Sequence, residues 1–507
     1  MAESKITRKF NISEMGITVT SIILMLLYSV RAFSTDYYVD SEIINTKEYL
    51  YNWDSIGRFG LIWIKKLTGL DWINPYMEAA LFLIALSLVA CLAMSLIKYL
   101  ESDIKDVFLV VFALLALVYP TYADQFLFRF QSFEVTLAML FVVLASYLLV
   151  LFLDKKYIWM YVTSITLLVL SFAVYQSMAN LMLLFYGALL MFLCRKRDAQ
   201  YVKKGFLFSM IQFVSSFGVY FLIDKIFYND GTYIAGKIGW KTDSVSVCVQ
   251  NIKDYVKDIV FANNPFYTRV FSITVILFVT AVIFSLSKVT KKEEYKIIST
   301  LIGALVTVSS PFYLTVIQGR KADYRAQIML PWCIAFMWIY AVTVFASYGK
   351  KTMERIAPLL LLVGIVSIFV NASETERFFY TESVIAKNDK ILATGLINDI
   401  EKCDTDKKVV FIGKREEGAN ASCYTTKDVL TYQTISVYRL DCDANPMYYH
   451  STKRILGYFE TMGFKYNRPD ETDMNEAYEI SKEMPVYPTE GSIKETENLI
   501  VVKIGEE

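Results

Sequence analysis

Two carboxylates stand four residues apart just after the first apolar run of this sequence. The run ends at Phe33, and the loop behind it, residues 34–60, reads STDYYVDSEIINTKEYLYNWDSIGRFG and contains Asp36 and Asp40. A carboxylate held beside a bound hydroxyl group can take its proton as that group attacks, which contributes typically ~10²–10⁴-fold to a rate. Residues four apart share a face of a helix, so both could point into one cavity. We predict Asp40 as the first candidate for a general base and Asp36 as the second.

Basic residues later in the chain offer a place for a phosphate. The segment QGRKADYRAQ, between two apolar runs, contains Arg320, Lys321 and Arg325. Arginine holds phosphate oxygens through paired, charge-assisted hydrogen bonds, and such contacts stabilise the charge that builds on a leaving phosphate. These three residues are the predicted phosphate ligands, with Arg58 and Arg129 as secondary candidates. The alternative interpretation is that they anchor the protein at a membrane surface.

Three more polar residues are predicted to support this site. Asp54 stands beside Gly57–Arg58 and is placed to orient that arginine, while Gln176 and Asn180 lie in the segment AVYQSMAN at the start of an apolar run. Amide groups at membrane depth are costly and tend to mark functional sites. Taken singly, each residue also fits a solvated loop or an interfacial position.

The composition excludes several other chemistries. The 507 residues carry a net charge of +1, which provides no global field for nucleic acid. The sequence has one histidine and no HExxH or clustered Cys/His spacing, so no zinc or iron site is expected, and a divalent metal is not indicated. No Walker A loop is present and no GxGxxG follows a strand. We therefore expect neither a nucleotide site nor a cofactor.

The seven cysteines divide between the apolar segments and the predicted exterior, where Cys248 lies in a loop and Cys403, Cys423 and Cys442 in the C-terminal part. An oxidising compartment would permit a disulfide there, and Cys423–Cys442 is the preferred pairing. Free, buried thiols are the alternative.

Apolar segments predict the fold class, an α-helical polytopic membrane protein with about eleven transmembrane helices. A helix needs ~20 mostly apolar residues to cross a bilayer, and segments of that length or slightly less recur through the first 371 residues. They lie at 15–33, 76–97, 107–121, 133–153, 157–175, 178–194, 206–227, 267–287, 297–317, 328–347 and 355–371.

Basic residues predict the orientation of these helices. Lysine and arginine concentrate in alternate connecting segments, which contain KITRK, KYLESDIK, DKK, RKRDAQYVKK, KVTKKEEYK and KKTMER. Because cytoplasmic loops carry this excess, the N-terminus is predicted to be cytoplasmic. The protein would be a multi-pass protein of the cell membrane, with its other face extracytoplasmic.

The C-terminal part reads as a second domain. Residues 1–371 form the predicted transmembrane domain and 372–507 an extracytoplasmic α/β domain. In the latter, KKVVFIG and NLIVVKI have the buried, β-branched character of strands, and STKRILGYFETMGF and NEAYEISKEM read as helices.

Several of these segments resemble those of a known family. The stretch DYYVDSEIINTKEYLYNWDSIGRFGLIWIKKL is similar to the first outer loop of the polytopic glucosyltransferases that modify bacterial O-antigens and related surface glycans, the Gtr type II family. In that group a carboxylate follows the first helix and a Trp…Gly-Arg element precedes the second. FAVYQSMANLMLLF resembles the family's Tyr-Gln-x-x-x-Asn stretch and ADYRAQIMLP its late Tyr-Arg segment. The ending MPVYPTEGSIKETENLIVVKI is like that of longer members.

The resemblance implies a GT-C-like membrane enzyme and a specific reaction. Its donor would be a polyprenyl-phosphate sugar such as undecaprenyl phosphate glucose, its acceptor a cell-surface glycan, and the transfer inverting, with an aspartate as the base. A flippase and a donor synthase would be further partners. Family members with two adjacent aspartates differ from this chain, where Asp36 and Asp40 are four apart, so the choice of base stays open.

Two other classes of function remain. A transporter or flippase of lipid-linked sugars would also bind such a lipid, but transporters often show internal repeats and charged or broken helices in mid-membrane, whereas the charges here concentrate near one edge. A sensor or assembly scaffold is the third class.

Overall fold

The computed structural model describes residues 13–34, 53–72, 74–228, 236–289, 293–415, 420–424, 436–438 and 450–506. The predicted bases Asp36 and Asp40 lie outside these residues, as does Cys442. The chain divides into two compact units, a helical unit that ends at Thr375 and a C-terminal unit that begins at Glu376.

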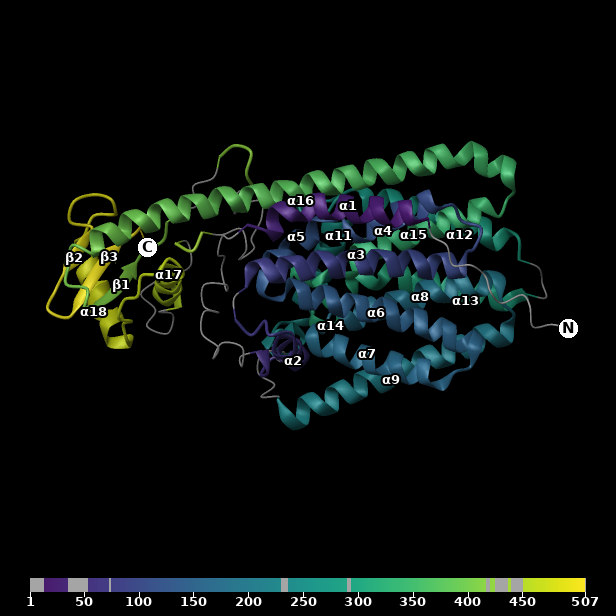
Figure 1. Ribbon diagram of the computed structural model, residues 1–507, viewed down its shortest axis with the longest axis horizontal. Coiled ribbons are helices and arrows are strands. Elements are labelled where there is room, and N and C mark those ends of the chain that lie inside the picture. Colours follow the sequence, from purple (N-terminus) through teal and green to yellow (C-terminus); the bar gives the residue numbers. More distant parts are fainter. Residues whose placement is uncertain are drawn as a thin grey trace. The chain divides into compact units, whose positions relative to one another are not determined.

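The helical unit contains long helices that lie side by side (Figure 1). Its elements are α1 (Glu14–Ala32), α2 (Phe59–Thr68), α3 (Pro75–Leu100), α4 (Asp106–Leu117), α5 (Pro120–Leu127), α6 (Arg129–Lys155), α7 (Ile158–Val174), α8 (Met178–Lys196), α9 (Ala199–Phe227), η2 (Gly239–Lys241), α11 (Val245–Phe261), α12 (Val270–Ser287), α13 (Glu294–Ser309), η4 (Ser310–Phe312), α14 (Tyr313–Gln318), η5 (Tyr324–Ala326), α15 (Met329–Ala346) and the first part of α16 (Lys350–Ile400).

This arrangement confirms a polytopic helical protein. In the described part of the chain, 8 helices are long and apolar enough to cross a membrane, or up to 9 if the bent pair α4–α5 counts as one span. Two shorter apolar helices, α1 and α7, accompany them. Every apolar segment predicted from the sequence is mostly helical, although 107–121 crosses the break between α4 and α5, and 297–317 continues from α13 through η4 into α14. Among the described helices, the sequence analysis missed α2, which is short, α11, which is amphipathic, and all of α5 beyond Thr121.

The bend between α4 and α5 is stabilised by hydrogen bonds from two tyrosines. Val118 and Tyr119 are extended, and because Pro120 lacks an N–H group, the helix cannot continue through it. The break leaves carbonyl groups at the end of α4 without partners in the helix. Tyr28 donates to the carbonyl of Leu117 (2.7 Å), and Tyr122 donates to that of Ala116 (3.1 Å). The bend places α5, and the start of α6, at one end of the bundle.

The C-terminal unit packs a small sheet against helices. Strand β3 (Leu499–Lys503) is central: β1 (Lys408–Ile412) pairs with it in parallel and β2 (Ile493–Glu495) antiparallel, which gives the order β1-β3-β2. The helices α17 (His450–Thr461) and α18 (Glu471–Ser481) accompany the end of α16. Thus both predicted strands and both predicted helices form. Cys423 is a buried free thiol, which agrees with the alternative of unpaired cysteines.

Candidate active site

A tight turn fixes Arg58 at the amino end of α2. The turn depends on Gly57, whose φ of +75° is unfavourable for residues with a side chain. Gln176 donates to the carbonyl of Ile56 (2.7 Å) and Tyr220 to that of Gly57 (3.3 Å). A Cβ at Gly57 would lie 2.8 Å from the Tyr220 hydroxyl and 3.0 Å from the Gln176 amide. Only glycine fits here. Because the predicted supporting residue Gln176 bonds to this turn, it helps to position Arg58.

The guanidinium group of Arg58 lies on an aromatic ring. Its central carbon is 4.7 Å from the centre of the Tyr175 ring, and Nη1 donates to Oε1 of Gln131 (3.3 Å). A guanidinium that stacks in this way presents its N–H groups in its own plane, the geometry that suits a phosphate.

Arg325 comes to the same region from the loop between α14 and α15. Its backbone N–H donates to Oδ2 of Asp124 on α5 (2.8 Å), and its guanidinium lies 4.7 Å from the centre of the Phe128 ring. Its Nη2 is 3.9 Å from Oδ2 of Asp323. The break before α5 therefore positions Arg325 through Asp124 and Phe128.

A third cation completes the group. Lys237 Nζ is 2.7 Å from Oδ2 of Asp323. Burial raises the pKa of Asp323, but the hydrogen bond and charge of Lys237, with the charges of Arg325 and Arg58, hold this pKa below its ordinary value of 3.8. The carboxylate is thus ionised at neutral pH, and all three cations are close enough to act on it. We call Arg58, Lys237, Arg325 and Asp323 the arginine cluster.

The charges of the same three cations also act on Tyr175. Burial raises the pKa of its phenol, and the positive charges of Arg58, Arg325 and Lys237 oppose that rise. The tyrosine therefore lies among the cations rather than beside one of them. Sequence reasoning missed Lys237 and Tyr175, since a loop lysine and a tyrosine near a membrane are both common.

Arg320 and Lys321 form ion pairs with other carboxylates. Arg320 forms two hydrogen bonds to the carboxylate of Asp243 (2.9 and 3.0 Å) and one each to Thr242 and the carbonyl of Gly236. Lys321 Nζ is 2.6 Å from Oδ2 of Asp258 on α11. In the structure these two predicted phosphate ligands thus pair with carboxylates other than Asp323. The contacts of Arg320 hold the loop that carries Arg325 to the segment that carries Lys237, and that of Lys321 holds the same loop to α11.

Three other predicted site residues, Arg129, Asn180 and Asp54, lie at or just before the amino ends of helices. Arg129 begins α6 and lines a small pocket with Glu78 and Ser132. Asn180 is buried in the first turn of α8. Asp54 contributes to the turn before α2 through its backbone, because its carbonyl accepts from the Gly57 N–H (3.0 Å). Burial raises the pKa of its side chain and the charge of Lys66 lowers it, so the expected role of the Asp54 carboxylate in orienting Arg58 stays a prediction.

A buried ion group anchors α2 beneath Arg58. Lys65 Nζ contacts Oε1 of both Glu78 on α3 (2.6 Å) and Glu134 on α6 (2.9 Å), and all three side chains are almost fully buried. Lys65 also lies 4.0 Å from the centre of the Phe130 ring. The signal in the sequence was two carboxylates, Glu78 and Glu134, within predicted apolar segments, but their contact with Lys65 was not predictable from the spacing of the three residues.

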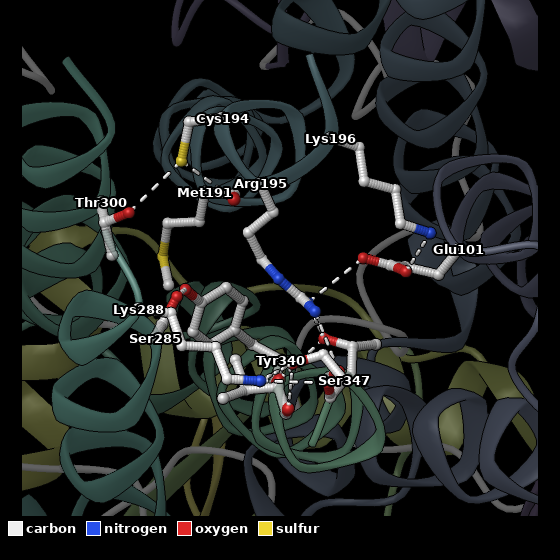
Figure 2. Close-up of polar contacts among 12 residues, drawn as sticks. Glu101, Met191, Cys194, Arg195, Lys196, Ser285, Lys288, Thr300, Tyr340 and Ser347 are labelled. Atoms are coloured by element: carbon white, nitrogen blue, oxygen red, sulfur yellow. Dashed lines mark hydrogen bonds and ion pairs between the residues drawn. The ribbon is translucent and has the colours of Figure 1, made fainter. Parts of the chain in front are cut away.

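The opposite ends of these helices carry cations in a different arrangement (Figure 2). Glu101, after α3, accepts from Arg195 Nη1 (3.2 Å) and Lys196 Nζ (2.5 Å) at the end of α8. Arg195 also donates to the hydroxyl and carbonyl groups of Thr343 on α15. We call Glu101, Arg195, Lys196 and Thr343 the Glu101 cluster. It connects α3, α8 and α15.

In the described residues, no group of three or more His, Cys, Asp or Glu side chains is placed to hold a metal ion. The carboxylates nearest the cations, Asp323 and Asp124, are bonded to Lys237 and to the backbone of Arg325. The geometry therefore offers a site for an anion held by two arginines and a lysine.

Comparison with known proteins gives one match. Residues 27–345 match the family described as Glucosyl transferase GtrII. The matched range includes the arginine cluster as well as Asp36 and Asp40. No curated protein matches the chain.

Proposed function

The chain belongs to the GtrII glucosyl transferase family, and we propose that this glucosyltransferase uses a polyprenyl-phosphate sugar as donor and a cell-surface glycan as acceptor. The observation that carries the proposal is the convergence of Arg58, Lys237 and Arg325 on Asp323. Three cations at the end of a membrane bundle suit a lipid phosphate that lies at the bilayer surface. Because the cluster lies at one end rather than in mid-membrane, transfer is favoured over transport.

The arginine cluster would stabilise the leaving group. As the bond between the anomeric carbon and the phosphate oxygen breaks, negative charge grows on that phosphate. Arg58 and Arg325 donate hydrogen bonds in the plane of their guanidinium groups, and preorganised donors of this kind are worth about 10²–10³-fold each. The amino end of α2, directly after Arg58, adds a favourable dipole. The donor phosphate therefore needs no acid to protonate it.

The base would come from the loop after α1. An acceptor hydroxyl attacks the anomeric carbon from the face opposite the phosphate, its proton passes to Asp40 or Asp36, and the configuration inverts. A single carboxylate is sufficient because the phosphate leaves as an anion. The reaction consumes one polyprenyl-phosphate sugar and releases polyprenyl phosphate.

We assign the N-terminus to the cytoplasm of a bacterial cell and the α2 end of the bundle to the outer face of its membrane. The distribution of Lys and Arg supports this assignment. A synthase would then form the donor inside the cell and a flippase would bring it to the outer leaflet. In this topology a cysteine introduced at Gln200 should be labelled only from the inside and one at Thr472 only from the outside. The opposite labelling would contradict it.

The base assignment is tested by transfer assays in proteoliposomes, with a radiolabelled polyprenyl-phosphate glucose on the accessible side. Asp40→Asn removes the base and keeps the size of the side chain, so transfer should fall by about 10²–10⁴-fold while donor binding survives. Glu42→Gln in the same loop is the matched control and should retain transfer. If both Asp40→Asn and Asp36→Asn transfer at the wild-type rate, the base lies elsewhere.

A further inference from the structure

An apolar crevice lies between α6, α8, α9 and α13. It encloses about 250 Å³, and its walls include Leu149 and Leu153 of α6, Leu190 of α8, Phe206 of α9 and Ile302 of α13. Its volume is below the roughly 300–1,000 Å³ of a pocket that encloses a whole small molecule. It therefore suits a segment of a longer chain.

The polar groups in its wall are bonded within the protein. The hydroxyl of Tyr186 donates to Oε1 of Gln212 (2.9 Å), and that of Ser209 donates to the carbonyl of Gly205 (2.8 Å). A cavity needs several polar partners to hold water, and apolar cavities stay dry and bind apolar molecules. The crevice is thus built for hydrocarbon.

Two glycines have opposite effects on the crevice: one lets its helices pack closely, and the other leaves space between them. A Cβ at Gly187 of α8 would lie 2.7 Å from a Val306 methyl on α13, so small residues there bring α8 and α13 into close contact. At Gly205 of α9 a Cβ would lie 3.4 Å from Leu153 and 3.5 Å from Leu193. Gly205 therefore leaves room between α9 and its neighbours, which a larger residue would fill.

The rim of the crevice meets the bilayer. Phe206 and Ile302 both line it, yet 48% and 43% of their surfaces are exposed. Both belong to helices that lie within membrane-spanning segments and are little buried in the bundle. A lipid chain can therefore enter from the side without passing through water.

Two helices connect the crevice to the arginine cluster. Tyr175 and Gln176 stand just before α8, and Tyr220 of α9 bonds to the Gly57 turn. Along α8 the crevice runs from Leu183 to Leu193. At a rise of 1.5 Å per residue, these residues lie about 8 to 22 Å below the amino end of α8. A chain that descends from a phosphate on Arg58 reaches this depth.

We propose that the crevice binds the isoprenoid chain of the donor, several units from the phosphate. The inference rests on the proposed function, since it assumes that the phosphate of that lipid lies in the arginine cluster. A long single chain can occupy both places at once. The crevice would then select donors by chain length, while the cluster selects them by charge.

The test measures binding of polyprenyl phosphates to the full-length protein in detergent. Wild-type protein should bind a long polyprenyl phosphate at least about tenfold more tightly than geranyl phosphate, which is too short to reach the crevice. Gly205→Leu fills the space and should weaken long-chain binding about tenfold, the loss expected when roughly two methylene groups leave an apolar site. Binding of geranyl phosphate should not change.

Gly218→Leu is the matched control, because it lies on the same helix and a Cβ there meets nothing within 4 Å. It should leave both affinities unchanged. If Gly205→Leu keeps the wild-type preference for the long chain, the proposal is wrong. If dioleoyl phosphatidylglycerol displaces the long polyprenyl phosphate equally well, the crevice is a site for ordinary bilayer lipid and the proposal is also wrong.

A second measurement covers the case in which Gly205→Leu does not fold. A photoreactive benzoylphenylalanine at Phe206 should crosslink to long-chain polyprenyl phosphate, whereas one at Ile211, exposed on the same helix, should not. Equal crosslinking at both positions would contradict the proposal. Failure of the proposed donor class appears differently: wild-type protein would then bind neither phosphate, and Arg58→Gln would change nothing.

Discussion

The two ends of the helical unit use the same residue types for different purposes. In the Glu101 cluster one carboxylate accepts from Arg195 and Lys196 (Figure 2), and Arg195 also bonds to Thr343. Each contact joins one helix to another. In the arginine cluster, Arg58 and Arg325 lie 4.7 Å from the centres of the Tyr175 and Phe128 rings, closer than the 5.6 Å between Arg195 and the centre of the Tyr340 ring. Their shared carboxylate, Asp323, comes from the same short loop as Arg325.

This difference in contacts distinguishes charged residues that join helices from charged residues that can bind a ligand. A cation bonded to groups on two helices has its position fixed by them, and moving it disrupts the bundle. A guanidinium stacked on a ring is fixed through its face, which leaves its edge for hydrogen bonds in its plane. The type of contact, rather than the density of charge, is thus the basis on which we propose an anion site at the arginine cluster.

The largest expected effect is on the buried ion group under Arg58. Lys65→Met leaves Glu78 and Glu134 buried together without their shared cation, and breaking a buried ion pair in this way costs about 3–5 kcal/mol. The free energy of unfolding in detergent should fall by that amount. Lys65→Met combined with Glu134→Gln should recover part of it. If the single variant is as stable as wild type, the group does not anchor α2.

The arginine cluster should show the reverse pattern, with a large loss of transfer and little loss of stability. Arg58→Gln removes a donor that acts on the leaving phosphate, so transfer should fall by about 10²–10³-fold. Arg325→Gln should do the same. Transfer rates per folded protein and unfolding midpoints, measured on the same samples, check the prediction. A fall in transfer that merely follows protein loss would place these arginines with the structural charges.

The sequence predicted the helices well and the cation partners poorly. Spans were predictable because the bilayer sets a length of apolar residues that each helix must show locally. The pairs Arg320–Asp243 and Lys321–Asp258 join residues 77 and 63 positions apart, and nothing local reports such a contact. Charge density in QGRKADYRAQ therefore favoured all three cations equally, although Arg325 acts with Arg58 on Asp323, whereas Arg320 and Lys321 pair with other carboxylates.

At the other end of the bundle, Glu101→Gln should reduce stability without reducing transfer. The change removes the charge that Arg195 and Lys196 share, and hydrogen bonds to charged groups contribute about 1.5–3 kcal/mol. We expect a fall of that size in the free energy of unfolding, with transfer per folded protein close to wild type. A loss of transfer comparable to that of Arg58→Gln would show that the two ends do not differ in function.

The smallest effect is expected at Arg320 and Lys321, and it gives the closest control for the arginine cluster. Both residues stand within five positions of Arg325 and carry the same charge, so any general influence of positive charge near the membrane is similar for all three. Their ion pairs are partly exposed, and such pairs contribute little. We expect Arg320→Gln and Lys321→Gln each to change transfer by less than about threefold.

Comparing these variants shows whether a cation in this loop must contact the donor phosphate or need only lie near it. If Arg320 and Lys321 act only by holding their loop to Asp243 and Asp258, then Asp243→Asn and Asp258→Asn should reproduce the same small effects. If instead they bind the donor phosphate, removing their carboxylate partners should strengthen donor binding, because the competing acceptor is gone. Donor affinity therefore moves in opposite directions under the two interpretations. A gain in affinity in Asp243→Asn or Asp258→Asn would return Arg320 or Lys321, respectively, to the phosphate site.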